Sequence, residues 1–170
     1  SFGVSGRTKK PLVLKSIRWI PPIPSWFKVN VDGAAAGAPG SAGCGGVFYT
    51  YRGIVKGCFY HYIGQGTAIE AELWSMIKVI TYVVHHGWHF LRLESDSMVV
   101  VDILRRRSRN VPWAMLSPWV DCLQLIDDLT LDVMHVYREV NQVVDVLSKK
   151  AIADSCSAWS NIALECCSHF

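Results

Sequence analysis

The sequence predicts an α/β fold in which helices pack on a mixed β-sheet, and three patterns indicate it. Apolar and polar residues alternate from Phe27 to Val31, which is typical of a half-buried strand. Residues 68–86 carry apolar side chains at helical spacing. After them, strand and helix patterns alternate, and each strand–helix–strand step implies parallel neighbours joined by a right-handed crossover.

The expected elements run along the chain as three strands, a helix, a strand, two helices, a strand and a helix. The first strand, residues 27–31, is followed by glycine-rich residues 33–46, which we expect to form a loop. Strands at 47–51 and 54–63 complete an antiparallel meander. The later elements are expected as a helix at 68–86, a strand at 90–95, a helix from Asp96 or Ser97 to about Arg107, a helix at 117–129, a strand at 131–137 and a helix at 142–153.

Composition favours one globular domain. Of 170 residues, 51% are hydrophobic and 18% are charged, which supplies a substantial core. We place the domain at residues 27–153. A basic, proline-containing arm or linker at 1–26 precedes it, and a tail at 154–170 with weak helical character and no assigned role follows.

Cysteine usage and hydropathy indicate the compartment. The six cysteines form no CxxC pair, which favours reduced thiols and an intracellular location in the nucleus, the cytoplasm or an organelle. No signal-peptide pattern is seen near Ser1, and no apolar run approaches the length of a membrane span. We therefore expect no membrane partner, and we expect a monomer.

Two carboxylates are expected to meet at one edge of the sheet. Asp32 ends the first strand and Asp96 ends the fourth. Ligands of open α/β sheets gather outside the carboxyl ends of parallel strands, so these side chains come together if the two strands are neighbours. Like charges so placed are unfavourable unless they share a proton or a cation. Hard oxygen ligands favour Mg²⁺.

Asp32 and Asp96 also have a purely structural interpretation, and so does a third acid, Asp145, in the last expected helix. Asp32 with Gly33 is a common turn pair. Asp96, followed by a serine, is a good helix N-cap. Asp145 can pair with Lys149 one helical turn away.

The first long helix carries two glutamates, Glu70 and Glu72. Glu72 has no basic residue three or four positions away, which weakens its interpretation as a surface ion pair. The two glutamates flank the apolar stripe at about equal angles. Periodicity therefore leaves open which of them faces the site.

Five segments in order resemble the ribonuclease H domain: VNVDGA, GAPGSAGCGGV, EAELWSMI, LESDSMVVVDIL and HVYREVNQVVDVLSKKA. The resemblance is greatest to the plant domain at the C-terminal end of non-LTR retroelement reverse transcriptases and in related stand-alone proteins. The lead-in RWIPPIPSWFKVNVDG resembles the linker before that domain. The resemblance spans about residues 19–152 and implies a ribonuclease H-like fold, with a five-stranded mixed sheet of three antiparallel and then parallel strands flanked by helices.

The resemblance also implies a metal site. Its catalytic, metal-binding acids match Asp32, Glu72, Asp96 and Asp145, and it selects Glu72 over Glu70 because the family's acid is followed by Leu or Tyr. The implied cofactors are two Mg²⁺ ions, with Mn²⁺ as a substitute. The implied activity is hydrolysis of the RNA strand of RNA–DNA hybrids. The implied partners are that hybrid and an upstream reverse-transcriptase or other domain.

Other positions are expected to contact the nucleic acid. The arginines that close a helix have an equally weighted structural interpretation, since cations complement a helix C-terminus. A strand histidine, here His135, is more often structural than functional, but its spacing suits an auxiliary group that helps products leave. The expected nucleic-acid-binding residues are Gly33, Arg105, Arg106, Arg107, Arg138 and Asn141.

Four apolar residues depart from the family pattern. Ala38, Ala68, Ile69 and Met98 stand where relatives often carry hydrogen-bonding side chains. Lost hydrogen bonds to bases or 2′-hydroxyls predict weaker hybrid binding. An alternative is therefore a nucleic-acid-binding or interaction domain that keeps the fold with little activity. A strand transferase or junction nuclease of the same superfamily is disfavoured by the plant-type motifs.

Overall fold

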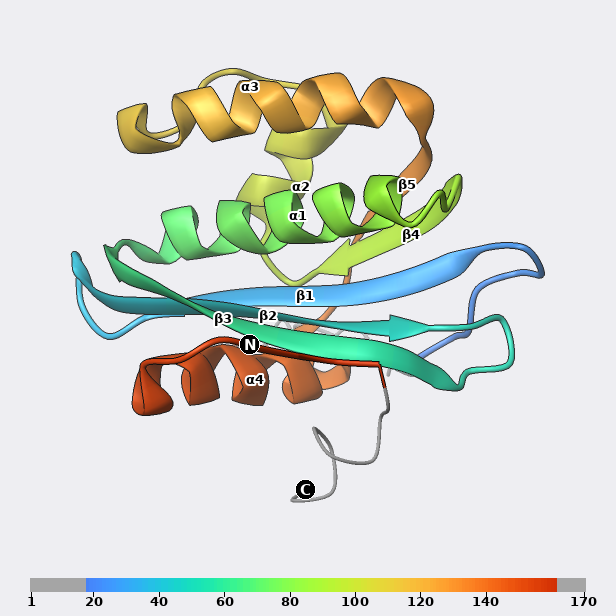
Figure 1. The fold of residues 1–170 in the computed structure, drawn as a ribbon, viewed down its shortest axis with the longest axis horizontal. Coiled ribbons are helices and arrows are strands. Elements are labelled where there is room, and N and C mark those ends of the chain that lie inside the picture. The colour runs from blue at the N-terminus through green and yellow to red at the C-terminus, as the bar shows by residue number, and fades with distance from the viewer. Residues whose placement is uncertain (1–17, 162–170) are drawn as a thin grey trace, which may run out of the picture.

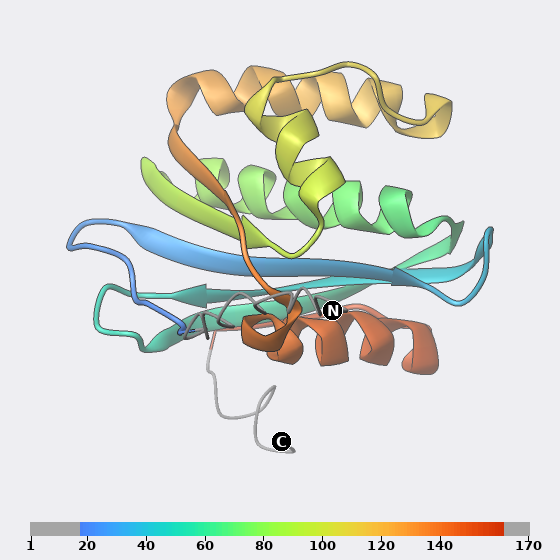
Figure 2. The same ribbon diagram turned by 180° about the vertical axis from the view of Figure 1, so that it is seen from behind.

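The computed structural model describes residues 18–161, which form a six-stranded sheet with helices on both faces (Figure 1; Figure 2 gives the view from behind). The strand order is β5-β4-β1-β2-β3-β6. The elements are β1 (Phe27–Ala35), β2 (Gly40–Tyr49), β3 (Val55–Gly66), α1 (Ala68–His85), β4 (Phe90–Ser95), α2 (Met98–Arg105), α3 (Leu116–Leu125), β5 (Thr130–His135), α4 (Gln142–Asp154) and β6 (Ala158–Ser160), with short 3₁₀ helices at Trp113–Met115, Ile126–Asp128 and Arg138–Val140.

The sheet is mixed, as predicted. β1, β2 and β3 pair antiparallel, whereas β4 runs parallel to β1 and β5 parallel to β4. Val31 of β1 lies opposite Ser95 of β4. The acids that follow these two residues, Asp32 and Asp96, therefore reach the same edge of the sheet side by side.

Two layers of apolar side chains hold the helices on the sheet. The larger core lies between the sheet and α1, and includes Leu73, Met76 and Trp119, all fully buried. The smaller cluster lies under α4 and includes Val47 and Leu147. Figure 1 shows α4 on the face opposite α1, with α3 stacked outside α1. The carboxyl edge of β1 and β4 is thus held between helices from both layers.

Most of the glycine-rich stretch 33–46 is strand, so the expected loop is wrong. β1 continues to Ala35, and β2 begins at Gly40 and takes in the residues before the expected 47–51 strand. The glycines permit close helix packing: a Cβ on Gly33 would lie 2.3 Å from the Ala71 carbonyl carbon, and one on Gly45 would lie 2.8 Å from Leu147 Cβ. Glycine shows no apolar–polar alternation, so the pattern hid these strands.

The expected five strands are six, because part of the tail pairs with the sheet. β6 runs antiparallel to β3, with Trp159 opposite Phe59, where weak helical character was expected. Trp159 of this short strand stacks on Tyr82 of α1, with ring centroids 3.8 Å apart, and this contact stabilises the strand. The expected 117–129 helix also ends early, since α3 stops at Leu125 and a 3₁₀ turn follows. Residues 162–170 of the tail lie outside the described part.

The described part of the lead-in, residues 18–26, packs against the sheet. Trp19 meets Tyr49 with ring centroids 4.8 Å apart, and Trp26 meets Phe90 at 5.6 Å. The boundary at residue 26 stays a prediction, and residues 1–17 of the expected arm lie outside the described residues. Within residues 18–161, every helix is too short or too polar to cross a membrane.

The contact between Gly33 and α1 predicts a large effect of one methyl group. Gly33→Ala should lower the free energy of unfolding by about 3 kcal/mol, because the new Cβ would meet rigid helix backbone. Urea denaturation measures it. Gly57→Ala is the matched control: its Cβ would meet the Ser160 carbonyl of the short edge strand at 3.0 Å, and we expect a loss of about 1 kcal/mol or less. Equal losses would contradict the helix contact as the cause.

Candidate metal centre

Three carboxylates meet at the carboxyl end of the parallel pair β1 and β4. Asp32 comes from β1, Asp96 follows β4 and Glu72 comes from α1, and one oxygen of each lies within 4.8 Å of the others. Asp32 is 4% exposed and Glu72 is 9% exposed. Three acids so close, two of them buried, repel one another when ionised, so the arrangement calls for protons or a cation.

A capping box at the start of α1 explains which glutamate reaches the site. Glu70 accepts a hydrogen bond from the Thr67 backbone N–H at 3.0 Å, and Thr67 Oγ1 accepts one from Glu70 N at 3.3 Å. Glu70 is therefore occupied at the helix end. Glu72 lies two residues further on and turns inward to Asp32 and Asp96. The geometry closes the choice that periodicity left open.

Burial and the closeness of the three carboxylates shift the pKa values of Asp32 and Glu72. Burial, with the nearby Asp96 charge, raises the pKa of Asp32 to about 6. Burial also raises the pKa of Glu72 well above its ordinary value, and the charge of Asp32 adds to it. Among the described residues, Glu72 Oε2 is buried and has no hydrogen-bond partner.

These three acids fit a divalent cation. A hard ion with oxygen ligands would neutralise the repulsion and would give the orphaned Glu72 oxygen a partner. The donor set is all oxygen, which suits Mg²⁺ or Mn²⁺ better than a metal that prefers sulfur or imidazole. The acidic triad Asp32, Glu72 and Asp96 is therefore consistent with divalent metal binding.

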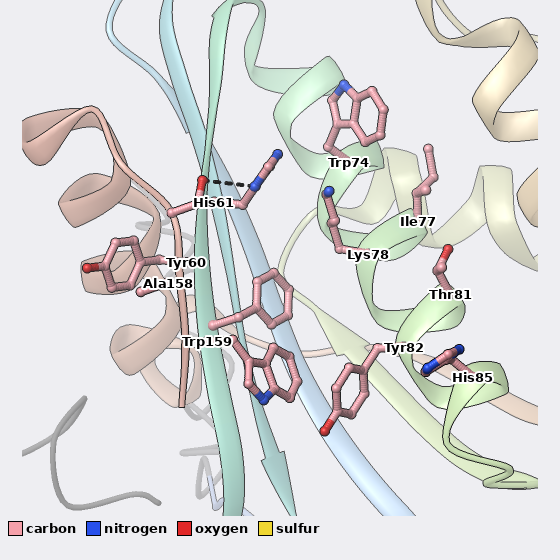
Figure 3. Close-up of a pocket in the computed structure, with 12 residues that line it drawn as sticks. Tyr60, His61, Trp74, Ile77, Lys78, Thr81, Tyr82, His85, Ala158 and Trp159 are labelled. Atoms are coloured by element: carbon pink, nitrogen blue, oxygen red, sulfur yellow. Dashed lines mark hydrogen bonds between the residues drawn. The ribbon is translucent and has the colours of Figure 1, made fainter. Parts of the chain in front are cut away.

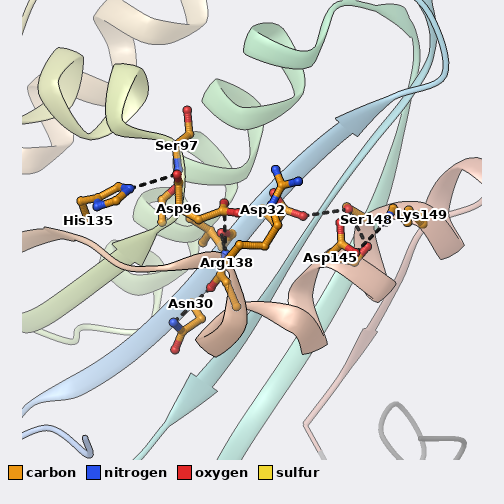
Figure 4. A network of polar contacts seen from close by, with 12 residues as sticks. Asn30, Asp32, Asp96, Ser97, His135, Arg138, Asp145, Ser148 and Lys149 are labelled. Atoms are coloured by element: carbon orange, nitrogen blue, oxygen red, sulfur yellow. Dashed lines mark hydrogen bonds and ion pairs between the residues drawn. The ribbon is translucent and has the colours of Figure 1, made fainter. Parts of the chain in front are cut away.

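Asp145 lies beside this triad but outside the 4.8 Å group. Its carboxylate, 32% exposed, pairs with Lys149 Nζ at 2.7 Å, as the structural interpretation predicts. Ser148 Oγ lies 3.3 Å from Asp32 Oδ2 and 2.9 Å from the Asp145 carbonyl oxygen (Figure 4). The Asp145 charge also helps to raise the pKa of Asp32. Its role as a metal ligand stays a prediction.

A buried ion pair lies next to the triad. Lys28 Nζ contacts Glu94 Oε2 at 2.9 Å, with side chains 2% and 7% exposed. Lys28 also donates to the Ile20 carbonyl at 2.7 Å and lies 4.3 Å from the Trp19 ring centroid. Burial lowers the pKa of Lys28, while the hydrogen bond and charge of Glu94 oppose that shift. The lead-in thus helps to surround the lysine.

Two buried asparagines connect this ion pair to the triad. Asn30 Nδ2 donates to Glu94 Oε2 at 3.1 Å and to Asn141 Oδ1 at 3.2 Å. Asn141 Nδ2 donates to the Val31 carbonyl at 2.8 Å and lies 3.4 Å from Asp96 Oδ1. A continuous chain of polar contacts therefore runs from the lead-in to Asp96.

Sequence reasoning missed this chain of contacts, although the sequence holds a signal for it. Asn30 lies two residues before Asp32, and Glu94 lies two residues before Asp96. Side chains two apart on a strand share one face, so the parallel register brings Asn30 and Glu94 together as it does the acids.

The remaining predicted residues lie around the site in different ways. Arg138, with its side chain 83% exposed, donates to Asp96 Oδ2 at 3.1 Å, and His135 Nε2 lies 3.2 Å from the Asp96 carbonyl oxygen (Figure 4). Asn141 is 2% exposed and bonds inward. Gly33 packs on α1. Their predicted contacts with nucleic acid stay predictions.

The three arginines at the end of α2 are exposed, and each has a partner within the fold. Arg105 donates to the Val133 carbonyl at 2.8 Å. Arg106 pairs with Asp102 at 2.9 Å, and Arg107 pairs with Asp127. These contacts hold the side chains at the surface, where a phosphate can still approach them.

Comparisons with known proteins agree with this geometry. Residues 30–151 match the family described as "Reverse transcriptase-like". The chain is 35% identical over 149 residues to an Arabidopsis thaliana protein named as a putative ribonuclease H protein, a match that covers 85% of this chain and 23% of that protein. The chain therefore spans about a quarter of the length of this relative.

Two solved structures share the fold. RNase H1 from the archaeon Halobacterium salinarum is 25% identical with a TM-score of 0.68, covering 76% of this chain and 98% of that one. LC11-RNase H1, isolated from compost and solved in complex with an RNA/DNA hybrid, is 22% identical with a TM-score of 0.68 and the same coverage. The expected ribonuclease H-like fold is confirmed.

The raised pKa of Asp32 predicts a pH dependence of stability without metal. Its pKa is about 6 in the folded protein and about 3.9 when unfolded, so between these values the folded state binds more protons. In EDTA, stability should therefore fall as the pH rises from about 4 to about 7. Asp32→Asn should remove about 2 to 3 kcal/mol of that fall. Urea denaturation at each pH measures the difference.

Asp121→Asn is the control for this experiment, because Asp121 is exposed on α3. Its pH profile should parallel that of the unchanged protein. Equal stabilities of Asp32→Asn and Asp121→Asn at neutral pH would exclude repulsion among the acids as the cause.

The buried Lys28–Glu94 pair predicts strong coupling between its partners. Lys28→Met should cost about 3 to 5 kcal/mol of unfolding free energy, because it leaves the Glu94 charge buried and unpaired. The double variant Lys28→Met/Glu94→Gln removes that charge and keeps an acceptor for Asn30, so it should recover more than half of the loss. Chemical denaturation of both variants tests this. A double variant no more stable than Lys28→Met would rule out the charge as the cause.

Proposed function

We propose that this chain, which belongs to the reverse transcriptase-like family of ribonuclease H domains, hydrolyses the RNA strand of RNA–DNA hybrids with the help of two divalent metal ions. The observation that carries the proposal is the approach of the Asp32, Glu72 and Asp96 carboxylates to within 4.8 Å. A relative with the same fold was solved bound to an RNA/DNA hybrid, which supports this choice of substrate.

In this proposal Asp32, Glu72 and Asp96 hold the cations, and Asp145 completes the set from α4. When bound, Mg²⁺ or Mn²⁺ supplies an activated water and neutralises charge that develops on the scissile phosphate. The register of β1 and β4 fixes the acids before substrate arrives, so little reorganisation is needed. The ion pair with Lys149 positions the Asp145 carboxylate at the start of α4.

Exposed cations near the triad are proposed to bind the nucleic-acid backbone. Arg138 bonds to Asp96 and keeps most of its guanidinium in solvent, so a phosphate at the metal site could share it. Arg105, Arg106 and Arg107 at the end of α2 offer a second contact further along a duplex. Binding through them should weaken as salt rises. His135, held at the Asp96 carbonyl, is the proposed auxiliary group.

A second candidate function is hybrid or partner binding with little cleavage. Met98 and Val99, which follow Asp96 closely, are 55% and 58% exposed. With Ile69 they line an open groove of about 680 Å³ beside the triad. These three apolar side chains offer no hydrogen bonds to bases or 2′-hydroxyls, although Asp102, Arg106, Ser108 and Asn110 also line the groove. Any upstream reverse-transcriptase or other domain also stays a proposal.

The two glutamates of α1 give a matched test of the proposed activity. Glu72→Gln should lower cleavage of a labelled RNA–DNA hybrid at least about a hundredfold, because it removes a carboxylate ligand and leaves only Asp32 and Asp96 of the triad to hold the cations. Glu70→Gln should keep near-normal cleavage, since glutamine can also complete the capping box. Both variants are assayed with Mg²⁺ and with Mn²⁺, and metal binding is followed by calorimetry.

The unchanged protein decides between the candidate functions. Cleavage under conditions in which a known ribonuclease H cuts the same hybrid supports the enzyme. Hybrid binding without any cleavage, in either metal, would sink the enzymatic proposal and favour the binding domain.

A further inference from the structure

An open groove of about 640 Å³ runs between α1 and the β3–β6 edge of the sheet, and none of its lining residues belongs to the carboxylate triad. Figure 3 shows Trp74, Lys78 and Tyr82 reaching into it from α1, with His61 and Trp159 on the opposite side. We call it the aromatic groove. Its volume lies within the range of small-molecule and nucleotide sites.

One aromatic ring of the aromatic groove keeps a free face. Trp159, which is 37% exposed, already stacks on Tyr82 and on Phe59, with ring centroids 3.8 Å and 5.7 Å apart. Trp74 has no aromatic neighbour among the described residues, and it is only partly buried. A planar ligand can therefore stack on Trp74, while the rings of Phe59, Tyr82 and Trp159 form an apolar wall.

The charge of the aromatic groove comes from Lys78, and no Asp or Glu lines the groove. Burial lowers the pKa of His61, so that ring is neutral near pH 7. Within residues 18–161, Lys78 forms no ion pair, and its ammonium lies 5.8 Å from the Trp74 ring centroid. An uncompensated cation beside an aromatic face suits a ligand that is both planar and anionic.

His61 adds a polar group with a fixed position. Its Nδ1 lies 2.9 Å from Ser157 Oγ, which in turn accepts a hydrogen bond from the Tyr62 backbone N–H at 2.9 Å. The ring is thereby held in place, and Nε2 has no partner among the described residues. It is available to the edge of a base that stacks on Trp74.

We propose that the aromatic groove binds an unpaired nucleotide of single-stranded nucleic acid, with the base stacked on Trp74 and its phosphate on Lys78. A purely apolar ligand would bury the Lys78 ammonium without a partner. A free nucleotide would depend on one ammonium, because the groove has no glycine-rich phosphate loop, whereas a strand adds further contacts along its backbone. Such binding needs neither metal nor hybrid cleavage.

Fluorescence anisotropy of a labelled oligo(dT) of about ten nucleotides in EDTA tests the charge contact, because EDTA separates binding from the metal site. Lys78→Gln should weaken binding about fivefold and reduce the salt slope of the binding constant by about 0.7. Lys56→Gln is the matched control, since Lys56 is exposed on β3 and does not line the groove. Equal affinities of the two variants overturn the proposal and leave the groove to a protein partner.

Trp74→Leu tests the stacking contact, with circular dichroism as the check that the variant folds. It should weaken oligo(dT) binding about fivefold or more. Photocrosslinking of a 5-iodouracil oligonucleotide to the unchanged protein gives a readout that needs no substitution: the crosslinked peptide should contain Trp74. Crosslinks found only in the arginine-rich segment 105–113 would overturn the proposal.

Discussion

The site depends first on how closely α1 approaches β1. Gly33 has no side chain, and this lets the backbone of Ala71 and Glu72 rest directly on the strand. That contact brings the Glu72 carboxylate over Asp32, while the parallel register with β4 supplies Asp96 from the side. Remove either constraint and the three oxygens no longer share one space. The glycine is therefore part of the site, although it contributes no ligand.

Bringing the acids together has a cost that the surrounding fold must meet. Burial and the neighbouring carboxylates raise the pKa of Asp32 to about 6, so this carboxyl holds its proton to a higher pH than an exposed aspartate does. The large core under α1 and the smaller cluster under α4 hold the acids in place against their repulsion. Native proteins commonly accept such strain where ligands or substrates later relieve it. A domain that had lost all use for a cation would gain stability by replacing one of these acids.

Much of this arrangement could be predicted from residue patterns, and the failures have physical causes. Asp32 and Asp96 were paired correctly because strand ends and crossover handedness fix which edge they reach. The choice of Glu72 came from family resemblance. The sequence also carries the capping-box pair Thr67 and Glu70, in which Glu70 caps the start of α1 and is not available to the metal site. The glycine-rich strands and the three-residue β6 were not predicted, because neither shows an alternation of apolar and polar residues. The bonds of the buried Asn30 were not predicted because a polar residue on a strand face normally meets water. Asn141 was expected to contact nucleic acid, and its inward bond to the Val31 carbonyl depends on where the start of α4 packs, which no local pattern indicates.

The contacts around Lys28 also define where a fragment must begin if the domain is to fold when it is fused to another protein. A fragment that starts at Phe27 would carry a buried ammonium stripped of the Ile20 carbonyl and of the Trp19 ring. Its Asn30 side chain would also lose the indole N–H of Trp19, which lies 3.4 Å from Asn30 Oδ1. Gene fusions that keep this domain functional should therefore join it upstream of Trp19. The segment that resembles a linker in the sequence thus supplies contacts on which the buried Lys28 depends.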